Sequence, residues 1–260
     1  VAVERIRQEL QKLLLGSRPR YGVELLRRTG ILARILPELL EGLGLRQNRW
    51  HRYDVYHHVL HVLEAAPPVL EVRLAALLHD IDKPRTAAPS RKHPGERTFY
   101  NHEASGAERA RAILERLRFP NRVVDTVVLL VREHQFVYDD TWSDAAVRRM
   151  LARVGRENFD ALLALREADV RGRGRRVEEG LENVRALGRR VRALRERELA
   201  LDVKDLALDG REVMEILGEG PSPRIGEAMR FLLGRVLEEP SVNEPDTLRT
   251  LLLGWKAGRA

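Results

Sequence analysis

The 260-residue chain contains no cysteine, which removes disulfide bridges and thiolate metal sites from consideration. Any metal ion must therefore be held by His, Asp and Glu side chains, and the absence of cysteine fits a cytoplasmic protein. Long apolar runs are lacking as well. No stretch of about 18 apolar residues occurs, so we expect no membrane span and no membrane partner.

Lysine is scarce in a chain that is otherwise rich in basic residues. Of 46 basic residues only five are Lys, and the formal net charge is +7. Two explanations remain open for this bias towards Arg. One is a GC-rich genome or adaptation to heat, and the other is phosphate binding, because the planar guanidinium group grips phosphate through two parallel hydrogen bonds.

Apolar residues recur every three or four positions along most of the chain, and no window alternates for long enough to make a convincing strand. We therefore predict an all-α fold. The expected helices cover residues 3–15, 22–28, 31–41, 54–65, 69–79, 103–117, 122–134, 144–154, 156–168, 171–200, 210–217, 224–238 and 245–255. Asn121 and Ser143 are the expected N-caps of two of them. The segment 85–100 is rich in Pro, Gly and basic residues and is expected to form an exposed loop.

One apolar helical run ends on a His-Asp pair. Residues 69–78 repeat apolar positions with a helical period, and the run ends on His79 and Asp80, followed by Lys83 and the helix-stopping Pro84. Two metal-ligand types side by side at the end of a buried helix predict a metal site that is held on rigid helices.

Further imidazole and carboxylate groups occur near the ends of other predicted helices: His58, His102, His134 and Asp169. Helices that are distant in sequence can bring their ends to one point, so these residues predict a site for one or two divalent ions, with Mn, Fe, Co, Ni, Zn or Mg all compatible. Such an ion lowers the pKa of a bound water and stabilises phosphoryl oxygens. Lys83, one turn past His79, is placed to offer a cation to phosphate.

The first ligand in this set is ambiguous from the residues alone. His57 and His61 share one helix face at a spacing of i, i+4, as two ligands would, and either is an alternative to His58. His51 and His93 are expected to be ordinary histidines without a ligand role.

The order of His58, His79 with Asp80, and Asp169 resembles the pattern of the HD superfamily of metal-dependent phosphohydrolases. His102 and His134 resemble the additional ligands of members with two metals, and Lys83 matches the frequent His-Asp-x-x-Lys. The resemblance implies a helical hydrolase that acts on a phosphomonoester, a 2′,3′-cyclic phosphodiester or a nucleotide, with Asp80 and Lys83 as catalytic residues. Asp82 departs from the pattern, because a small residue usually stands there; an extra carboxylate would either bind a metal or hinder phosphate approach.

The flanks are similar to bacterial tRNA nucleotidyltransferases and poly(A) polymerases. Residues 4–39 resemble the helical segment that follows the catalytic head of that family, and residues 201–252 resemble its tRNA-contacting domain. The resemblance implies a neck-like RNA-binding segment at 1–48, an HD metal-binding domain at 49–172 and a basic tRNA-contacting domain at 173–260. It also implies an alternative function, in which the chain is the RNA-binding body or tail of such an enzyme and the HD domain is largely structural.

The catalytic head of that family needs a Gly-Ser loop and an Asp-x-Asp pair on strands. Gly16-Ser17 is the only Gly-Ser pair, and no acidic pair follows it at a suitable distance. We therefore expect no nucleotide transfer from this chain alone. The chain starts at Val1 rather than Met, and two alternatives stay open: the body and tail of a longer enzyme, or a stand-alone descendant.

A strongly basic stretch covers residues 171–197, with ten Arg against four Glu and an apolar residue every three or four positions. This pattern predicts an amphipathic helix with a basic outer surface, and tRNA or another RNA as its partner. The phosphate-binding candidates are Arg173, Arg175, Arg176, Arg189, Arg192 and, at a helix start, Gly226. The competing interpretation is a solvated basic face and a turn between packed helices.

Overall fold

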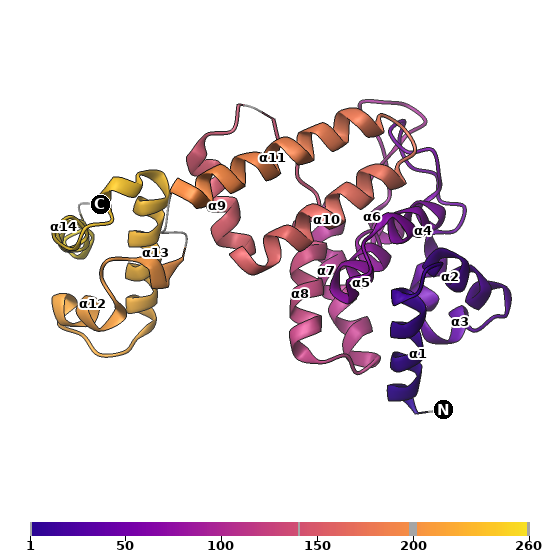
Figure 1. Cartoon of the computed structure of the whole chain (residues 1–260), viewed down its shortest axis with the longest axis horizontal. Helices are drawn as coiled ribbons and strands as arrows, with labels where there is room; N and C mark the ends of the chain where they lie inside the picture. Colours follow the sequence, from indigo (N-terminus) through magenta and orange to yellow (C-terminus); the bar gives the residue numbers. More distant parts are fainter. Residues whose placement is uncertain (1, 140, 198–201, 259–260) are drawn as a thin grey trace. The chain divides into compact units, whose positions relative to one another are not determined.

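The computed structural model describes residues 2–139, 141–197 and 202–258 and is drawn in Figure 1. Over these residues the chain forms fourteen α-helices, three short 3-10 helices and one pair of two-residue strands. The prediction of an all-α fold is confirmed. None of the helices in the described part is long and apolar enough to cross a membrane.

The chain divides into two compact units. The larger unit comprises residues 1–138 and 158–186, and the smaller unit comprises residues 139–157 and 187–260. The division by function into 1–48, 49–172 and 173–260 stays a prediction.

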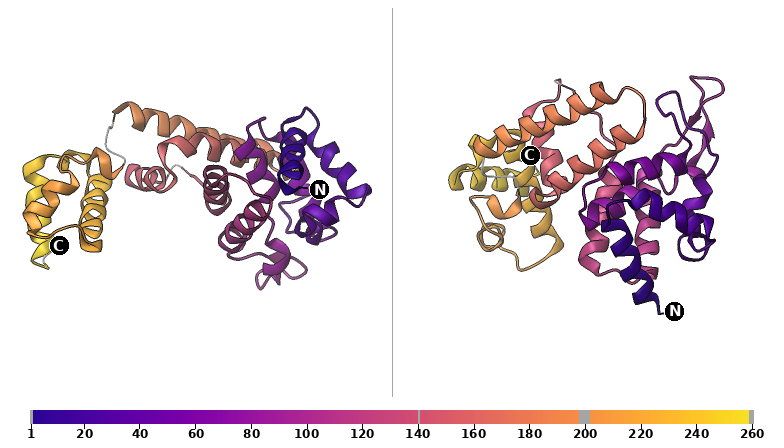
Figure 2. Two further views of the ribbon diagram at one scale, coloured as in Figure 1. Left: turned by 90° about the horizontal axis from the view of Figure 1, so that it is seen from below. Right: turned by 45° about the vertical axis from the view of Figure 1, so that its right-hand side comes forward.

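The larger unit contains the first eight helices, most of α10 and the first half of α11. These are α1 (Val3–Leu15), α2 (Pro19–Arg28), α3 (Leu32–Ile35), η1 (Pro37–Gly42), α4 (Val55–Ala65), α5 (Leu70–Leu78), α6 (Lys83–Thr86), α7 (His102–Arg116), α8 (Asn121–Glu133), α10 (Arg156–Gly172) and α11 (Val177–Arg197). Helix α7 packs along α8, α8 packs on α5, and α5 packs on α4, while α1 and α2 cover α4 and α5 (Figure 2).

Helices α4 and α5 are buried because their sequences are apolar on most sides. Every residue from Val72 to Leu78 is buried, and in α4 the same holds for Tyr56, Leu60 and Leu63. Each such side chain stabilises the fold by about 1.5–3 kcal/mol relative to exposure. The Asp54 carboxylate caps α4 by accepting the His57 N–H at 2.7 Å. Two rigid, capped helices therefore carry the first two groups of candidate ligands.

Glycine allows one close approach that positions the site. A Cβ on Gly172, the last residue of α10, would stand 3.0 Å from the backbone nitrogen of Val62 in α4 and closer still to its side chain. Only a residue without a side chain fits there, so the end of α10 lies directly against α4. This contact brings Asp169 of α10 beside His58 of α4.

The smaller unit is built on α13. It contains α9 (Asp144–Val154), the second half of α11, η2 (Val203–Asp205), α12 (Gly210–Leu217), α13 (Pro223–Glu238), η3 (Pro240–Val242) and α14 (Pro245–Lys256). Helix α13 packs against α9, α12 and α14. Its core includes the fully buried Leu208, Val213, Leu232 and Leu248. The amphipathic helix expected over residues 171–200 is shorter, because a turn at 173–176 precedes it; residues 198–200 lie outside the described part.

Several local expectations fail. Pro84 does not stop a helix but is the second residue of α6, and the helix expected over 31–41 is divided into α3 and η1. The segment 85–100 contains a minimal antiparallel pair, β1 (Ala88–Pro89) with β2 (Arg97–Thr98), rather than loop alone. Asn121 is the first helical residue of α8 and caps nothing, because the extended Pro120 occupies the N-cap position. The Ser143 cap of α9 is confirmed, since its hydroxyl accepts the N–H of Ala146 at 3.2 Å.

Candidate metal centre

The six candidate ligands come from five helices and lie in the interior of the larger unit. His58 belongs to α4, His79 and Asp80 follow the last turn of α5, His102 begins α7, His134 follows α8, and Asp169 lies in α10. None of the six is more than 4% exposed. Charged and polar groups are buried to this degree only when partners or a metal ion compensate their loss of water.

Asp80 lies at the centre of the cluster. Its Oδ2 is 3.4 Å from Nε2 of His58 and 3.2 Å from Nε2 of His79. Its Oδ1 is 3.4 Å from Nε2 of His102 and 3.8 Å from Nε2 of His134. The ligand atoms form two triads with Asp80 in common, and within each triad they lie within 4.8 Å of one another. The arrangement could therefore hold one ion, or one ion at each triad.

Backbone contacts fix how three of the imidazoles present their nitrogen lone pairs. The Nδ1 atoms of His79, His102 and His134 donate to the carbonyl oxygens three residues earlier, at 2.9, 2.6 and 2.7 Å. A carbonyl oxygen only accepts, so Nδ1 carries the proton and Nε2 carries the lone pair. Metal-ligating histidines show this pattern, in which an outer contact fixes the tautomer.

The inward-facing nitrogen and oxygen atoms of the cluster lie close to one another. Nε2 of His79 and Nε2 of His58 stand 3.2 Å apart. Neither Asp80 oxygen accepts a hydrogen bond of regular geometry from the part of the chain that the structure describes, although the Lys83 ammonium lies 2.7 Å from Oδ2. Lone pairs that face one another in a buried site repel unless a cation or a proton lies between them. The donor set therefore fits a bound divalent ion.

Asp169 joins the cluster through His58, with Oδ1 at 3.2 Å from Nε2. Its other oxygen is held by two guanidinium groups, Arg166 at 2.6 Å and Arg173 at 3.0 Å. Arg166 also donates to the carbonyl of Phe136 at 2.7 Å. One Asp169 oxygen thus remains directed towards the imidazoles while Arg166 and Arg173 fix the carboxylate.

Burial and neighbouring charges shift the pKa values of the clustered side chains. Burial disfavours ionisation of Asp80, but His79 and Lys83 outweigh it and hold the pKa of Asp80 well below its ordinary value. Burial lowers the pKa of His58, and it lowers the pKa of His134 to about 3. Burial also lowers the pKa of His79, but the charge of Asp80 outweighs burial, so that the pKa of His79 is raised. The buried Asp80 carboxylate thus faces the Lys83 ammonium, 2.7 Å from its Oδ2.

The structure separates the three neighbouring histidines of α4. His58 points into the cluster, whereas the half-exposed His57 pairs its Nδ1 with the Asp54 carboxylate at 2.8 Å. His61 stacks on Tyr53 with ring centroids 4.1 Å apart, and its Nδ1 accepts from Arg20. Only His58 of these three reaches Asp80 and Asp169.

Lys83 and Asp82 lie beside the cluster in different surroundings. The Lys83 ammonium reaches Asp80 and also donates to the Gln47 side chain at 2.7 Å. The Asp82 carboxylate instead lies 3.4 Å from Nη1 of Arg109 and belongs to neither triad. The departure at Asp82 therefore adds a structural ion pair and no ligand.

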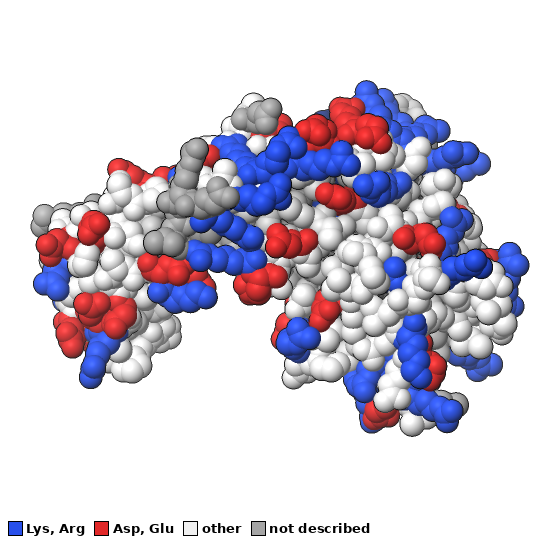
Figure 3. Space-filling model, viewed as in Figure 1, with Lys and Arg blue, Asp and Glu red and all other residues white. Residues whose placement is uncertain are grey.

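The candidate phosphate-binding residues fall into three places. Arg173, Arg175 and Arg176 line a pocket of the larger unit. Arg189 and Arg192 are exposed on the second half of α11, over which Figure 3 shows basic side chains gathered. Gly226 is the fourth residue of α13, and its part in phosphate binding stays a prediction.

Sequence reasoning missed several residues around the centre. His51 packs edge-on against His58, with ring centroids 5.0 Å apart, and Asn48 accepts from its Nδ1 at 2.8 Å. Burial and the Lys83 charge lower the pKa of His51 to about 2, so it stays neutral. Arg166 was also missed, although its spacing of three residues before Asp169 on a helix was a visible signal.

Two protein-family profiles match this chain, one over the HD region and one over the N-terminal segment. The profile of the HD domain matches residues 33–208. A second profile, described as a probable RNA and SrmB-binding site of polymerase A, matches residues 1–43. Together they confirm the resemblances drawn from the sequence.

Curated relatives extend the match along the chain. A CC-adding tRNA nucleotidyltransferase of Thermus thermophilus is 38% identical over 267 residues, covering 99% of this chain and 58% of the relative. An A-adding tRNA nucleotidyltransferase of Deinococcus radiodurans is 37% identical over 260 residues, covering 98% and 58%. A multifunctional CCA protein of Halorhodospira halophila is 40% identical over 141 residues, covering 52% and 32%. The chain thus spans a little over half the length of the first two relatives.

Proposed function

The chain belongs to the HD-domain family, and from this premise we propose that its buried His/Asp cluster holds one or two divalent metal ions and hydrolyses phosphate esters. The observation that supports the proposal is the convergence of four imidazole Nε2 atoms on the buried Asp80 carboxylate, whose oxygens accept no hydrogen bond of regular geometry from the described residues. The substrate classes remain those of the sequence analysis: a phosphomonoester, a 2′,3′-cyclic phosphodiester or a nucleotide.

Each residue of the centre would have a distinct role. The four imidazoles with Asp80 and Asp169 would hold the ions, which when bound supply an activated water and neutralise phosphoryl charge. Lys83, whose ammonium is fixed by Asp80 and Gln47, would offer its positive charge to a phosphoryl oxygen. Arg166 and Arg173 would keep the Asp169 carboxylate oriented.

The test is elemental analysis combined with hydrolysis assays on the purified chain. We expect stoichiometric metal after reconstitution, and turnover of p-nitrophenyl phosphate or of a 2′,3′-cyclic nucleotide. Asp80→Asn keeps the shape and removes the charge, so it should lose both metal and turnover. Asp125→Asn is the control, because that carboxylate is exposed on α8 and pairs with Arg111. Protein that stays metal-free, or equal rates in Asp80→Asn, would reject the proposal.

A second role is favoured by a separate observation, the match of nearly the whole chain to tRNA nucleotidyltransferases. In this role the chain binds tRNA, as the body of such an enzyme. The comparisons support this role more directly than the hydrolase, since the first two relatives are named for nucleotide addition. The exposed Arg side chains of α11 would contact the RNA backbone (Figure 3). The two roles are compatible, because a hydrolase centre can trim the RNA that the chain binds.

The RNA-binding role predicts a steep salt dependence. Arg189→Glu with Arg192→Glu should weaken tRNA binding and reduce the slope of log K against log salt by roughly 0.7–0.9 for each lost phosphate contact. Arg122→Glu with Arg132→Glu makes the same charge change on the exposed face of α8 and serves as the control. Equal effects of the two double substitutions would mean that net charge alone governs binding, and would contradict a site on α11.

A further inference from the structure

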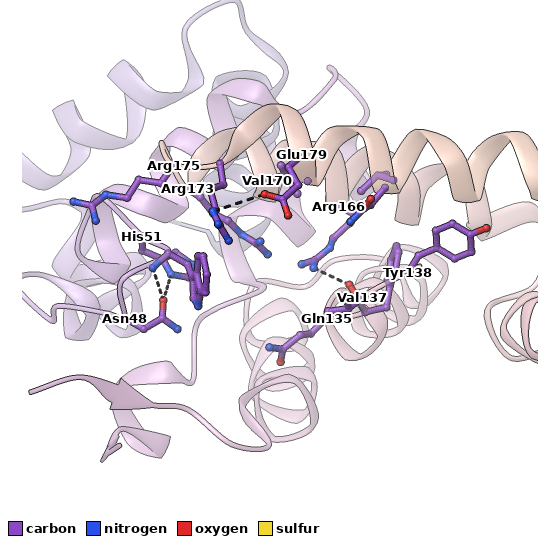
Figure 4. A pocket seen from close by; sticks show the side chains of 16 residues that line it. Asn48, His51, Gln135, Val137, Tyr138, Arg166, Val170, Arg173, Arg175 and Glu179 are labelled. Atoms are coloured by element: carbon purple, nitrogen blue, oxygen red, sulfur yellow. Dashed lines mark hydrogen bonds and ion pairs between the residues drawn. The ribbon is translucent and has the colours of Figure 1, made fainter. Parts of the chain in front are cut away.

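A pocket of about 430 Å³ lies in the larger unit beside the candidate metal centre. Its wall is formed by the segments around residues 48–51 and 135–138 and by parts of α10 and α11. Figure 4 shows Arg173 and Arg175 on the side of this space where His51 and Asn48 lie, and Arg166 across it, near Val137 and Tyr138. The volume falls within the range of about 300–1,000 Å³ that is usual for small-molecule sites.

The pocket wall touches the metal centre directly. His51, which lines the pocket, packs against His58 with ring centroids 5.0 Å apart. Arg166 and Arg173, which also line it, both hold the Asp169 carboxylate. A ligand in the pocket would therefore lie one side chain away from two of the candidate ligands.

The charge of the lining selects an anion. Four arginines line the pocket against one acidic residue, Glu179, which is exposed and 3.7 Å from Arg176. The Nε atom of Arg173 is buried and finds no hydrogen-bond acceptor among the described residues. The lining thus offers several guanidinium donors to an anionic group, and guanidinium donors suit phosphate oxygens.

The remaining lining suits a nucleobase. The Arg176 guanidinium lies over the Trp50 ring, 4.7 Å from its centroid. Aromatic rings and guanidinium planes are the surfaces on which unpaired bases stack. The amides of Asn48, Gln135 and Asn183 add donors and acceptors for a base edge. Arg176 holds a positive φ of 51°, an unusual conformation for a residue with a side chain, at the turn that places it over Trp50.

We infer that this pocket binds a single unpaired nucleotide, with its phosphate on the arginines nearest the metal centre and its base on the Trp50–Arg176 platform. This inference rests on the proposed hydrolase and names its substrate class: a nucleoside phosphate, either free or as the end of an RNA chain. The pocket positions that nucleotide next to the ligands His58 and Asp169.

Binding is measured first, by calorimetry on metal-free protein, so that the result does not depend on hydrolysis. The probes are adenosine 3′-monophosphate, adenosine and inorganic phosphate, because a purine stacks most strongly. We expect the nucleotide to bind roughly tenfold to a hundredfold tighter than either fragment. Trp50→Ala and Arg176→Ala should each weaken it about tenfold, while Arg122→Ala, on α8 outside the pocket, should not. Equal affinity for phosphate and nucleotide, or equal effects of all three variants, would overturn the inference.

Two further measurements distinguish RNA ends from free nucleotides and nucleotide binding from hydrolysis. A single-stranded hexa-adenylate with a 3′-phosphate that binds tighter than the mononucleotide assigns the pocket to RNA ends, whereas equal binding assigns it to free nucleotides; both results support the inference. With metal restored, Trp50→Ala should lower kcat/KM for the nucleotide relative to p-nitrophenyl phosphate. Hydrolysis without a change in this ratio would refute the pocket and leave the hydrolase standing. Nucleotide binding without any hydrolysis would refute the hydrolase and leave the pocket standing.

Discussion

Two adjacent histidines of α4 provide a sharp test of the metal centre. His57 and His58 share a chemistry and a helix, but His58 is fully buried against Asp80 and Asp169 while His57 is half exposed beside Asp54. We expect His58→Ala to abolish the stabilisation that added divalent metal confers, and His57→Ala to preserve it. The comparison holds composition, net charge and helix constant.

The expected size follows from linkage. An ion that binds only the folded state stabilises it by about 2.7 kcal/mol when its concentration is a hundred times Kd. For a domain of about 150–250 residues, each kcal/mol shifts Tm by roughly 2–4 °C. Wild type and His57→Ala should therefore gain about 5–11 °C on metal addition. Loss of the contact between His57 and Asp54 lowers the free energy of unfolding by about 0.5 kcal/mol or less, because His57 is half exposed to solvent.

The assay is differential scanning calorimetry of each variant with and without metal, since the difference within one variant cancels any packing loss caused by the substitution. His58→Asn, which keeps a polar group of smaller volume, replaces His58→Ala if the latter does not fold. A metal-dependent shift that survives in the His58 variants, or that disappears equally in His57→Ala, would refute the assignment of His58 as a ligand.

Three other outcomes follow from the same geometry. Lys83→Met should keep the metal content while lowering kcat on p-nitrophenyl phosphate about a hundredfold, since a cation aimed at phosphate is lost; a kcat that falls only as metal falls would contradict this. Gly172→Ala should lower the free energy of unfolding by about 1–3 kcal/mol, as the added methyl group meets Val62, and urea titration measures it. Metal-free protein should lose stability as pH falls below about 6.5, because the unfolded chain then binds protons that the folded His51, with its pKa lowered to about 2, cannot bind. His51→Gln should reduce that slope by at most about 1.4 kcal/mol per pH unit, the exposed His93→Gln should not, and urea midpoints between pH 4.5 and 6.5 distinguish them.

Periodicity predicted the helices because burial of one face is a local property of the sequence. The boundaries of α1, α9 and α12 agree with the prediction, since each ends where a Gly follows the last apolar turn. The His-Asp pair was recognised for a similar reason, as a polar ending on an apolar helix is visible in the sequence. Asn121 shows the limit of this reasoning: it is a favoured cap residue, but the preceding Pro120 takes the cap position.

The choice among the three histidines of α4 was left open because the helix is apolar on several sides. In the structure, His58 lies on the same helix face as the buried Val55 and Val62. His57 and His61 lie on the face of the exposed Glu64. Spacing from buried valines was therefore a usable signal. The pocket had no such signal, because segments from three distant parts of the chain form its wall and only the tertiary fold brings them together.

The charges around the centre bear on which ion would bind. Two buried carboxylates, Asp80 and Asp169, already face the cations of Lys83, Arg166 and Arg173. The extra carboxylate of Asp82 lies on Arg109 and adds nothing to the ligand set. Attraction for a dication thus cannot rest on surplus negative charge and must rest on the imidazole lone pairs. Imidazole favours Zn, Fe, Ni or Cu over Mg, which prefers oxygen ligands, so we expect a transition metal to bind more tightly than Mg in a direct competition.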